Sequence, residues 1–268
     1  MENLVKPPPK LPPPLPAAGE HIAYHLARTA TDLPTRKGVT YVWAGNGLFK
    51  HAWNGATRAL VQLTWTHTPG LGELRPFVSW RGWADPLPAA LLNEALADAL
   101  DCYRPEAPQE RQWFIVLRGG APVLVTPEQQ AGSAHLSYEM PHDQVLVDIH
   151  SHHGMAPFFS GTDDGDDTWL GLSLVIGRLG SPFPSAVARI NCYGHHTEVD
   201  VPDLFAGALL AGPLLLASER EVRQREGLPP SHLFADLHDA PAFDKQAAIQ
   251  GFTEPWEKES DADPAPSL

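Results

Sequence analysis

An apolar segment that runs directly into two histidines is the feature that most limits how this chain can fold. Residues 144–149 have the composition of a buried strand, and His150 and His152 follow at once. Side chains two residues apart lie on the same side of a strand, so both imidazoles can face one point. Ser160 and Asp163 come shortly after. Two imidazole nitrogens and a carboxylate oxygen, with one position left for water, are the ligands of a catalytic zinc. His150, His152 and Asp163 are therefore the predicted metal ligands.

The same residues also have a purely structural interpretation. Ser160 followed three residues later by Asp163 is the pattern of a capping box at the start of a helix, and a helix that carries a ligand still needs a cap. A solvated His-rich turn is the alternative to the metal site. The acidic run 163–167 hints at a calcium loop but lacks the spacing and the final Glu of an EF-hand, so a helical first turn is favoured. His195 and His196 are expected in a surface turn, with a secondary metal or substrate contact as the alternative.

The chain divides by composition into four stretches. Residues 1–19 are Pro-rich and predict an extended tail. Residues 20–85 predict a small β-rich module, with a hairpin over 39–53. Residues 86–205 mix one helix with apolar strands, which predicts an α/β (α+β) domain with a mixed β-sheet covered by helices. Residues 206–268 predict a helical extension, with a helix over 214–225, and an acidic disordered tail.

Within these stretches, apolar residues at three- and four-residue spacing predict a helix from about 86 to 103. Strands are expected over residues 59–65, 75–80, 113–117, 121–126, 134–138, 144–149, 172–179 and 186–193. Five of the eight Trp residues fall before residue 85, and most of these are expected in the core. Cys102 and Cys192 are both expected to be buried packing residues.

Charge and composition exclude several classes of function. There are 32 acidic against 19 basic residues, a net charge of −13, which disfavours binding to nucleic acid or to anionic membranes. No apolar run approaches the roughly 20 residues of a membrane span, and no secretory signal begins the sequence, so a cytoplasmic protein is expected. The sequence contains no phosphate-binding glycine loop and no Gly-x-Ser-x-Gly motif, which removes NTPases and serine hydrolases.

The spacing His-x-His-x7-Ser-x2-Asp over residues 150–163 resembles the JAMM motif of the JAB/MPN metalloprotease superfamily. The resemblance spans roughly residues 87–204, and the run HSHHGMAPFFSGTDDGDD is most similar to the bacterial branch that includes the plasmid-associated PRTRC systems. It implies a JAB/MPN (cytidine-deaminase-like) core. One departure is His153, which stands where many members have Pro.

The resemblance also implies roles for single residues. His150, His152 and Asp163 would bind one Zn²⁺ per chain, and Ser160 would stabilise the oxyanion. The family's Glu precedes the strand after the first helix, where Glu110 is the match; Glu106, Glu128 and Glu139 are rivals for the same role. Glu110 would act as general base.

Two functions follow from the resemblance. The first is a zinc isopeptidase or peptidase that cleaves an amide near the C-terminus of a ubiquitin-like or other extended protein. Such a substrate is expected to add as a strand beside the motif. The second is a catalytically silent binding module in a multi-protein system. Ubiquitin-like and E1-like proteins are the implied partners, and the complete motif favours the enzyme.

Overall fold

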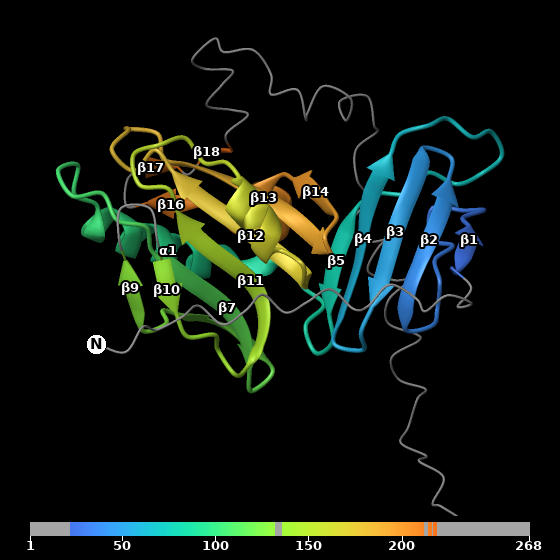
Figure 1. Ribbon diagram of the computed structural model, residues 1–268, viewed down its shortest axis with the longest axis horizontal. Helices are drawn as coiled ribbons and strands as arrows, with labels where there is room; N and C mark the ends of the chain where they lie inside the picture. Colours follow the sequence, from blue (N-terminus) through green and yellow to red (C-terminus); the bar gives the residue numbers. More distant parts are fainter. Residues whose placement is uncertain (1–21, 132–135, 212–213, 216, 219–268) are drawn as a thin grey trace, which may run out of the picture.

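The N-terminal part of the computed structural model is a five-stranded sheet (Figure 1). The structure describes residues 22–131, 136–211, 214–215 and 217–218. The strands follow one another in chain order, and β1 pairs with β2 in parallel while the other pairs are antiparallel. Their bounds are β1 Tyr24–Leu26, β2 Gly38–Ala44, β3 Gly47–Trp53, β4 Thr57–Thr64 and β5 Phe77–Trp80.

The predicted hairpin is β2 and β3, and its tight turn depends on glycine. Gly47 has φ 147°, and a Cβ at this position would lie 2.1 Å from the carbonyl oxygen of Thr64 on the next strand. Any side chain would therefore push β3 away from β4.

The second part is a mixed sheet of seven strands. Its order is β14-β13-β12-β11-β7-β8, with β18 paired to β13. The pairs β11–β12 and β13–β18 are parallel, and the others are antiparallel. The bounds are β7 Gln112–Arg118, β8 Ala121–Val125, β11 Gln144–Ser151, β12 Leu170–Gly177, β13 Ser185–Cys192, β14 His196–Val199 and β18 Ala217–Ser218.

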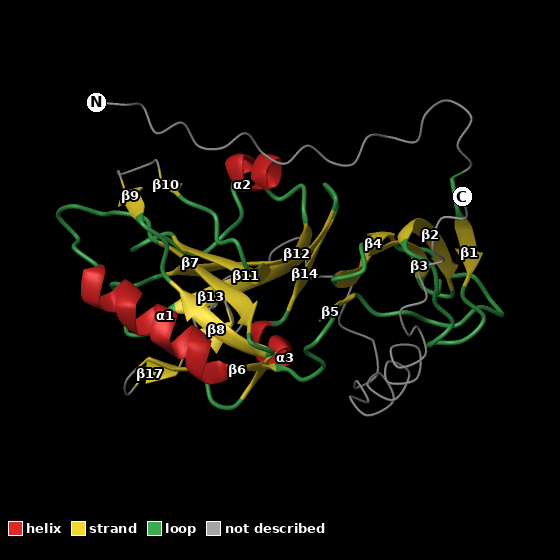
Figure 2. Ribbon diagram, turned by 90° about the horizontal axis from the view of Figure 1, so that it is seen from below, coloured by secondary structure: helices red, strands yellow, loops and turns green. Residues whose placement is uncertain are grey.

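Helix α1 (Ala89–Cys102) covers one face of this sheet, as predicted from its apolar spacing (Figure 2). Leu92, Leu96 and Ala99 are buried on it and pack with Trp113, Ile149 and other residues of the central strands. The opposite face carries the short helix α2 (Gly161–Asp166). The sheet thus has an apolar side under α1 and a second side that is free to hold polar groups.

The two sheets share one hydrophobic core cluster. Ala52, Ala59 and Val61 of the N-terminal sheet belong to the same cluster as the buried residues of the mixed sheet. Hydrogen bonds cross the same boundary, because Lys50 Nζ donates to the carbonyl of Tyr193 over 2.9 Å. A second, smaller cluster around Phe49 is formed by residues of the N-terminal sheet and of its loops.

The remaining described elements are short. They are β6 Leu87–Pro88, β9 Gln129–Ala131, β10 Leu136–Tyr138, α3 Val201–Leu204, β15 Phe205–Ala206, β16 Leu210–Ala211 and β17 Leu214–Leu215. The helix predicted over 214–225 is wrong where the structure describes it, because 214–215 and 217–218 are strands. The rest of this predicted helix and both predicted tails lie outside the described residues, in 1–19 and 219–268. No described helix has the length and apolarity needed to cross a membrane.

Two burial predictions are confirmed only in part. Among the five N-terminal Trp residues Trp80 is buried, while Trp53 and Trp83 are half-buried and Trp83 packs against the core. Trp43 and Trp65 are exposed. Cys102 is exposed at the end of α1, whereas Cys192 is buried as predicted.

Candidate metal centre

The two predicted histidine ligands lie at the end of the central strand β11. β11 has hydrogen-bonded partners on both sides, β7 and β12, so the backbone that carries His150 is held from two directions. The pairing continues past the strand, where the His152 amide donates to the carbonyl of Ile176 over 2.7 Å. Both edges of β11 are therefore occupied, so a substrate strand could not pair with β11 itself.

Helix α2 brings Ser160 and Asp163 to the same place. Ser160 is its N-cap: Ser160 Oγ accepts from the Asp163 amide over 3.2 Å, and Asp163 Oδ2 accepts from the Ser160 amide over 2.6 Å. The predicted capping box is confirmed. It uses only one oxygen of the carboxylate, and Oδ1 lies 3.6 Å from His150 Nε2. Asp163 can therefore cap the helix and act as a ligand together.

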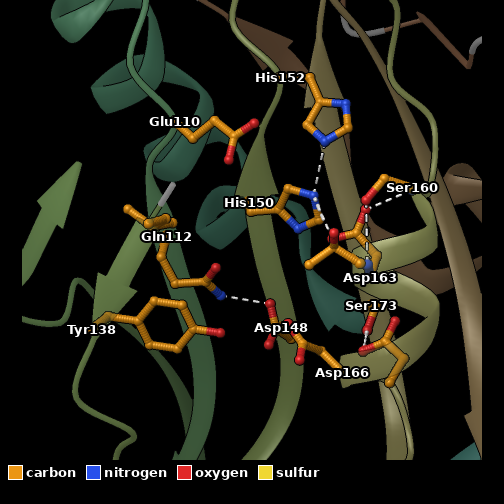
Figure 3. Close-up of a pocket in the computed structure, with 13 residues that line it drawn as sticks. Glu110, Gln112, Tyr138, Asp148, His150, His152, Ser160, Asp163, Asp166 and Ser173 are labelled. Carbon is orange, nitrogen blue, oxygen red and sulfur yellow. Dashed lines mark hydrogen bonds and ion pairs between the residues drawn. The ribbon is translucent and has the colours of Figure 1, made fainter. Parts of the chain in front are cut away.

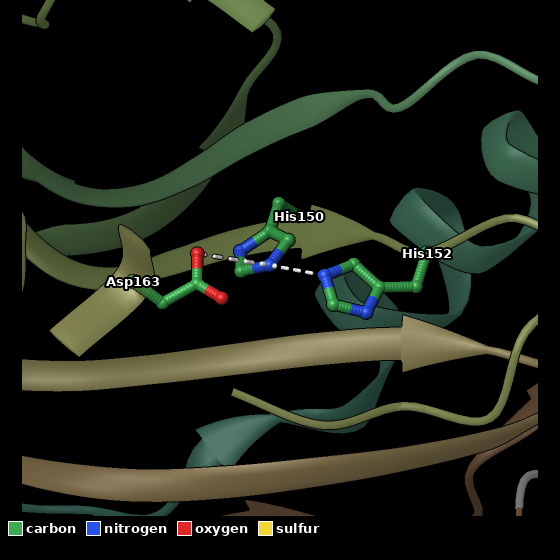
Figure 4. Close-up of side chains that lie close together, drawn as sticks. All are labelled: His150, His152 and Asp163. Atoms are coloured by element: carbon green, nitrogen blue, oxygen red, sulfur yellow. Dashed lines mark hydrogen bonds and ion pairs between the residues drawn. The ribbon is translucent and has the colours of Figure 1, made fainter. Parts of the chain in front are cut away.

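The ligand atoms of His150, His152 and Asp163 converge (Figure 4). All three lie within 4.8 Å of one another, and the two Nε2 atoms are 3.2 Å apart. His152 Nδ1 is buried and has no hydrogen-bond partner among the described residues. Two imidazole nitrogens and one carboxylate oxygen fit a catalytic zinc site with an open fourth position. The donor set therefore fits the metal.

Charges at the centre favour the forms that bind a metal. Burial, together with neighbouring His150, lowers the pKa of His152 to about 4, so its imidazole is neutral at pH 7. Burial acts to raise the pKa of Asp163, but His150 and the hydrogen bonds from Ser160 outweigh it and the pKa is lowered. A neutral imidazole and an ionised carboxylate are the states that ligate.

Glu110 lies in the same pocket, which has a volume of about 170 Å³ (Figure 3). Its place is fixed by its neighbour: the amide of Arg111 donates to Ser151 Oγ over 3.1 Å, and the Ser151 amide donates to the Arg111 carbonyl over 3.0 Å. Arg111 is also paired with Asp98 of α1. Burial, and then the charge of Asp163, raise the pKa of Glu110. A carboxylate with a raised pKa is suited to accepting a proton.

The other predicted site candidates lie elsewhere. The three rival glutamates are exposed and do not line this pocket: Glu106, Glu128 and Glu139. His153 also lies outside its lining. The calcium-loop alternative is disfavoured because the last carboxylate of the acidic run, Asp167, is buried against Arg189.

The second histidine pair has different neighbours. His195 Nδ1 lies 3.1 Å from Lys50 Nζ, and His196 Nδ1 lies 2.9 Å from Asn191 Oδ1. Burial lowers the pKa of both histidines. A lysine ammonium beside His195 opposes a metal cation, which disfavours a metal site at this turn.

Sequence reasoning missed several polar residues on this side of the sheet. Gln112 is buried and donates to Asp148 Oδ1 over 2.5 Å, and Tyr138 lies beside them in the pocket (Figure 3). Arg189 is buried and pairs with Asp167. The available signal was a charged residue in each of two apolar strands, Asp148 and Arg189. A buried charge requires a partner, so each of them indicates a polar contact.

One known protein family matches the part of the chain that contains this site. Residues 89–191 match the family model of prokaryotic homologs of the JAB domain. The match supports a place in the JAB/MPN superfamily for this segment, which begins at α1 and ends in β13 and contains all the residues of the candidate metal centre. It covers less than half of the chain. No curated protein matches the sequence.

Proposed function

We propose that the protein is a zinc-dependent isopeptidase or peptidase that hydrolyses an amide bond with an activated water. The observation that carries the proposal is the convergence of His150, His152 and Asp163 beside Glu110 in one pocket. The match of residues 89–191 to the JAB homologs supports it, because that superfamily includes metalloisopeptidases.

The metal ligands and the base have separate tasks. His150, His152 and Asp163 would hold Zn²⁺, which when bound lowers the pKa of water and polarises a carbonyl. Glu110 accepts the proton of the attacking water and later donates it to the leaving amine. Burial and then the charge of Asp163 raise the pKa of Glu110, which favours both accepting the proton and donating it later.

Ser160 can serve the helix and the reaction together. Its oxygen accepts the hydrogen bond of the Asp163 amide, which leaves the hydroxyl proton available to donate. We assign that proton to the oxygen of the substrate carbonyl as negative charge develops on it.

The substrate class rests on the resemblance of the motif. The resemblance suggests the extended C-terminal tail of a ubiquitin-like protein, in a plasmid-associated system that also contains an E1-like partner. Because both edges of β11 are paired, the tail would reach the metal through the mouth of the pocket and would not extend the sheet beside the motif.

The test is cleavage of a ubiquitin-like protein joined through its C-terminus to a reporter. We expect cleavage at that junction, loss of cleavage with a zinc chelator, and recovery when zinc is restored. His150→Ala/His152→Ala should be inactive under all three conditions. Protein that binds zinc and the ubiquitin-like partner but releases no reporter would support the silent binding module instead.

A further inference from the structure

The helix that carries Asp163 has little apolar packing of its own. α2 has six residues and none of them is buried. A helix of this length is unstable alone, since nucleation costs more than a few hydrogen bonds return. Its position over the sheet must therefore come from polar contacts, and these converge on one residue of the neighbouring strand β13.

That residue is Arg189, whose side chain is 5% exposed. Its Nη1 contacts Asp164 Oδ1 at 2.5 Å, and its Nε and Nη2 donate to Asp167 Oδ2 over 3.0 and 2.8 Å. Asp164 lies in α2 and Asp167, three residues later, is its C-cap, so both carboxylates can face the same guanidinium. The guanidinium also lies 4.0 Å from the centre of the Phe159 ring, directly before the N-cap. One guanidinium thus holds α2 before its first residue, in its middle and at its C-cap.

Side chains of strands β12 and β13 also hold Asp167 in place. Asp167 Oδ1 accepts from Ser173 Oγ over 2.9 Å, and Ser173 Oγ accepts from Asn191 Nδ2 over 2.7 Å. Ser173 is paired with Arg189 across β12 and β13, and with Asp148 across β11 and β12. The hydrogen bonds to Asp167 therefore anchor α2 on the strand next to β11, which carries His150.

Arg189 does not line the pocket, so it is not a ligand or a catalytic residue. We propose that Arg189 is a positioning residue that sets the metal affinity of the site, by holding α2 so that Asp163 Oδ1 faces His150. This inference rests on the metal centre of the proposed function. Contacts behind the ligands of metal sites typically change affinity by about 10- to 100-fold when removed.

The test is titration of metal-free, full-length protein with Zn²⁺ in competition with a chromophoric chelator. Arg189→Met should weaken zinc binding about 10- to 100-fold. Arg189→Lys should recover part of the affinity, because an ammonium can reach one carboxylate but cannot bridge two. With Co²⁺, the visible absorption should change in Arg189→Met, since it reports the arrangement of the ligands.

A matched control is Lys50→Met, which removes another buried cation at the boundary of the two sheets. It should lower the melting temperature and leave zinc affinity and the cobalt spectrum unchanged. If Arg189→Met does not fold, Asp167→Asn provides the same test, because it preserves shape and removes the charge that Arg189 contacts.

Three results would refute either the positioning role of Arg189 or the metal centre itself. Unchanged zinc affinity in the Arg189 and Asp167 variants, with the wild type binding zinc, refutes the positioning role and leaves the proposed function intact. An equal loss of affinity in Lys50→Met shows general destabilisation and also refutes it. A wild type that binds no zinc refutes the metal centre itself.

Discussion

Two histidine pairs lie at strand ends of the same sheet, and only one of them forms a candidate metal centre. His150 and His152 lie at the end of β11, and His195 and His196 at the turn between β13 and β14. His152 is buried and His150 half-buried, whereas His195 is exposed and His196 half-buried. The first faces the carboxylate of Asp163, whereas the second faces the ammonium of Lys50 and the amide of Asn191.

The difference shows that the neighbouring groups, and not the number of histidines, decide what a pair can bind. A carboxylate adds negative charge and a third ligand atom, so a cation is stabilised. An ammonium at 3.1 Å repels a cation and uses the ring nitrogen as an acceptor. The sequence indicates Asp163 as the third ligand of the first pair, whereas the fold alone brings Lys50 to the second.

The largest expected effect is the loss of metal from one pair and not from the other. His150→Ala/His152→Ala should reduce zinc from about one per chain to none, because two of three ligands are removed. His195→Ala/His196→Ala should keep the full content. Elemental analysis of both purified double variants measures this. Equal zinc loss in the two would show that the comparison is wrong.

The next effect separates the base from the ligands. Glu110→Gln should retain zinc and the fold but lower cleavage by at least about 10²-fold, since an amide cannot accept the proton of water. Glu139→Gln is the matched control, because Glu139 is exposed outside the pocket. Activity assays on metal-loaded proteins distinguish them. A fully active Glu110→Gln protein would transfer the role of base to another group.

Ser160 tests whether a helix cap also takes part in catalysis. Ser160→Ala should cost about 1 kcal/mol in the free energy of unfolding through the lost cap. It should also reduce turnover by about 10²- to 10³-fold with little change in substrate binding, because the hydroxyl donates only in the transition state.

A second substitution at the same position completes this test. Ser160→Asp retains an N-cap acceptor but places a negative charge beside the developing one, so it should fold and remain inactive. Steady-state kinetics and urea unfolding of both variants measure the two effects. An active Ser160→Asp enzyme would mean that the residue is a cap alone.

The smallest effect concerns His51, another histidine that faces a cation. Arg58 Nε donates to His51 Nε2 over 2.7 Å, and burial with the Arg58 charge lowers the pKa of His51 to about 3. His51 is neutral in the folded protein. Its contribution to the free energy of unfolding is therefore fully present above the unfolded-state pKa near 6.5, and it is lost as the pH falls toward the folded-state pKa of about 3. Between pH 6.5 and pH 5, His51 should lower the free energy of unfolding by about 2 kcal/mol.

Urea unfolding at the two pH values measures that contribution. His51→Gln should be less sensitive to acid than the wild type, because glutamine does not take up the proton. His67→Gln, at an exposed loop position, should behave as the wild type. Equal acid sensitivity in all three proteins would remove His51 as the cause.

The sequence predicts the parts of this molecule that depend on neighbours along the chain. The hairpin over 39–53, helix α1, the strand before His150 and the Ser160–Asp163 capping box all follow from local spacing, and the structure contains each of them. The grouping of the two histidines with Asp163 also follows, because the intervening loop is short.

Contacts between distant segments were not predictable in this way. The pairing of Arg189 with Asp164 and Asp167 joins strand and helix across the sheet, and no local pattern specifies it. The exposure of Trp43 and Cys102 is also set by which face meets the rest of the chain. The position of Glu110 follows from the Arg111–Ser151 hydrogen bonds, which join residues 40 apart.

The hydrophobic cluster shared by the two sheets has a consequence for any attempt to cut this protein into pieces. A fragment beginning near residue 86 would contain the whole metal centre, yet it would expose to water the apolar surface that Ala52, Ala59 and Val61 cover in the intact protein. Newly bared apolar surface of this kind promotes self-association. The matched family segment therefore shares part of its hydrophobic core with the N-terminal sheet, and a stable fragment should include that sheet.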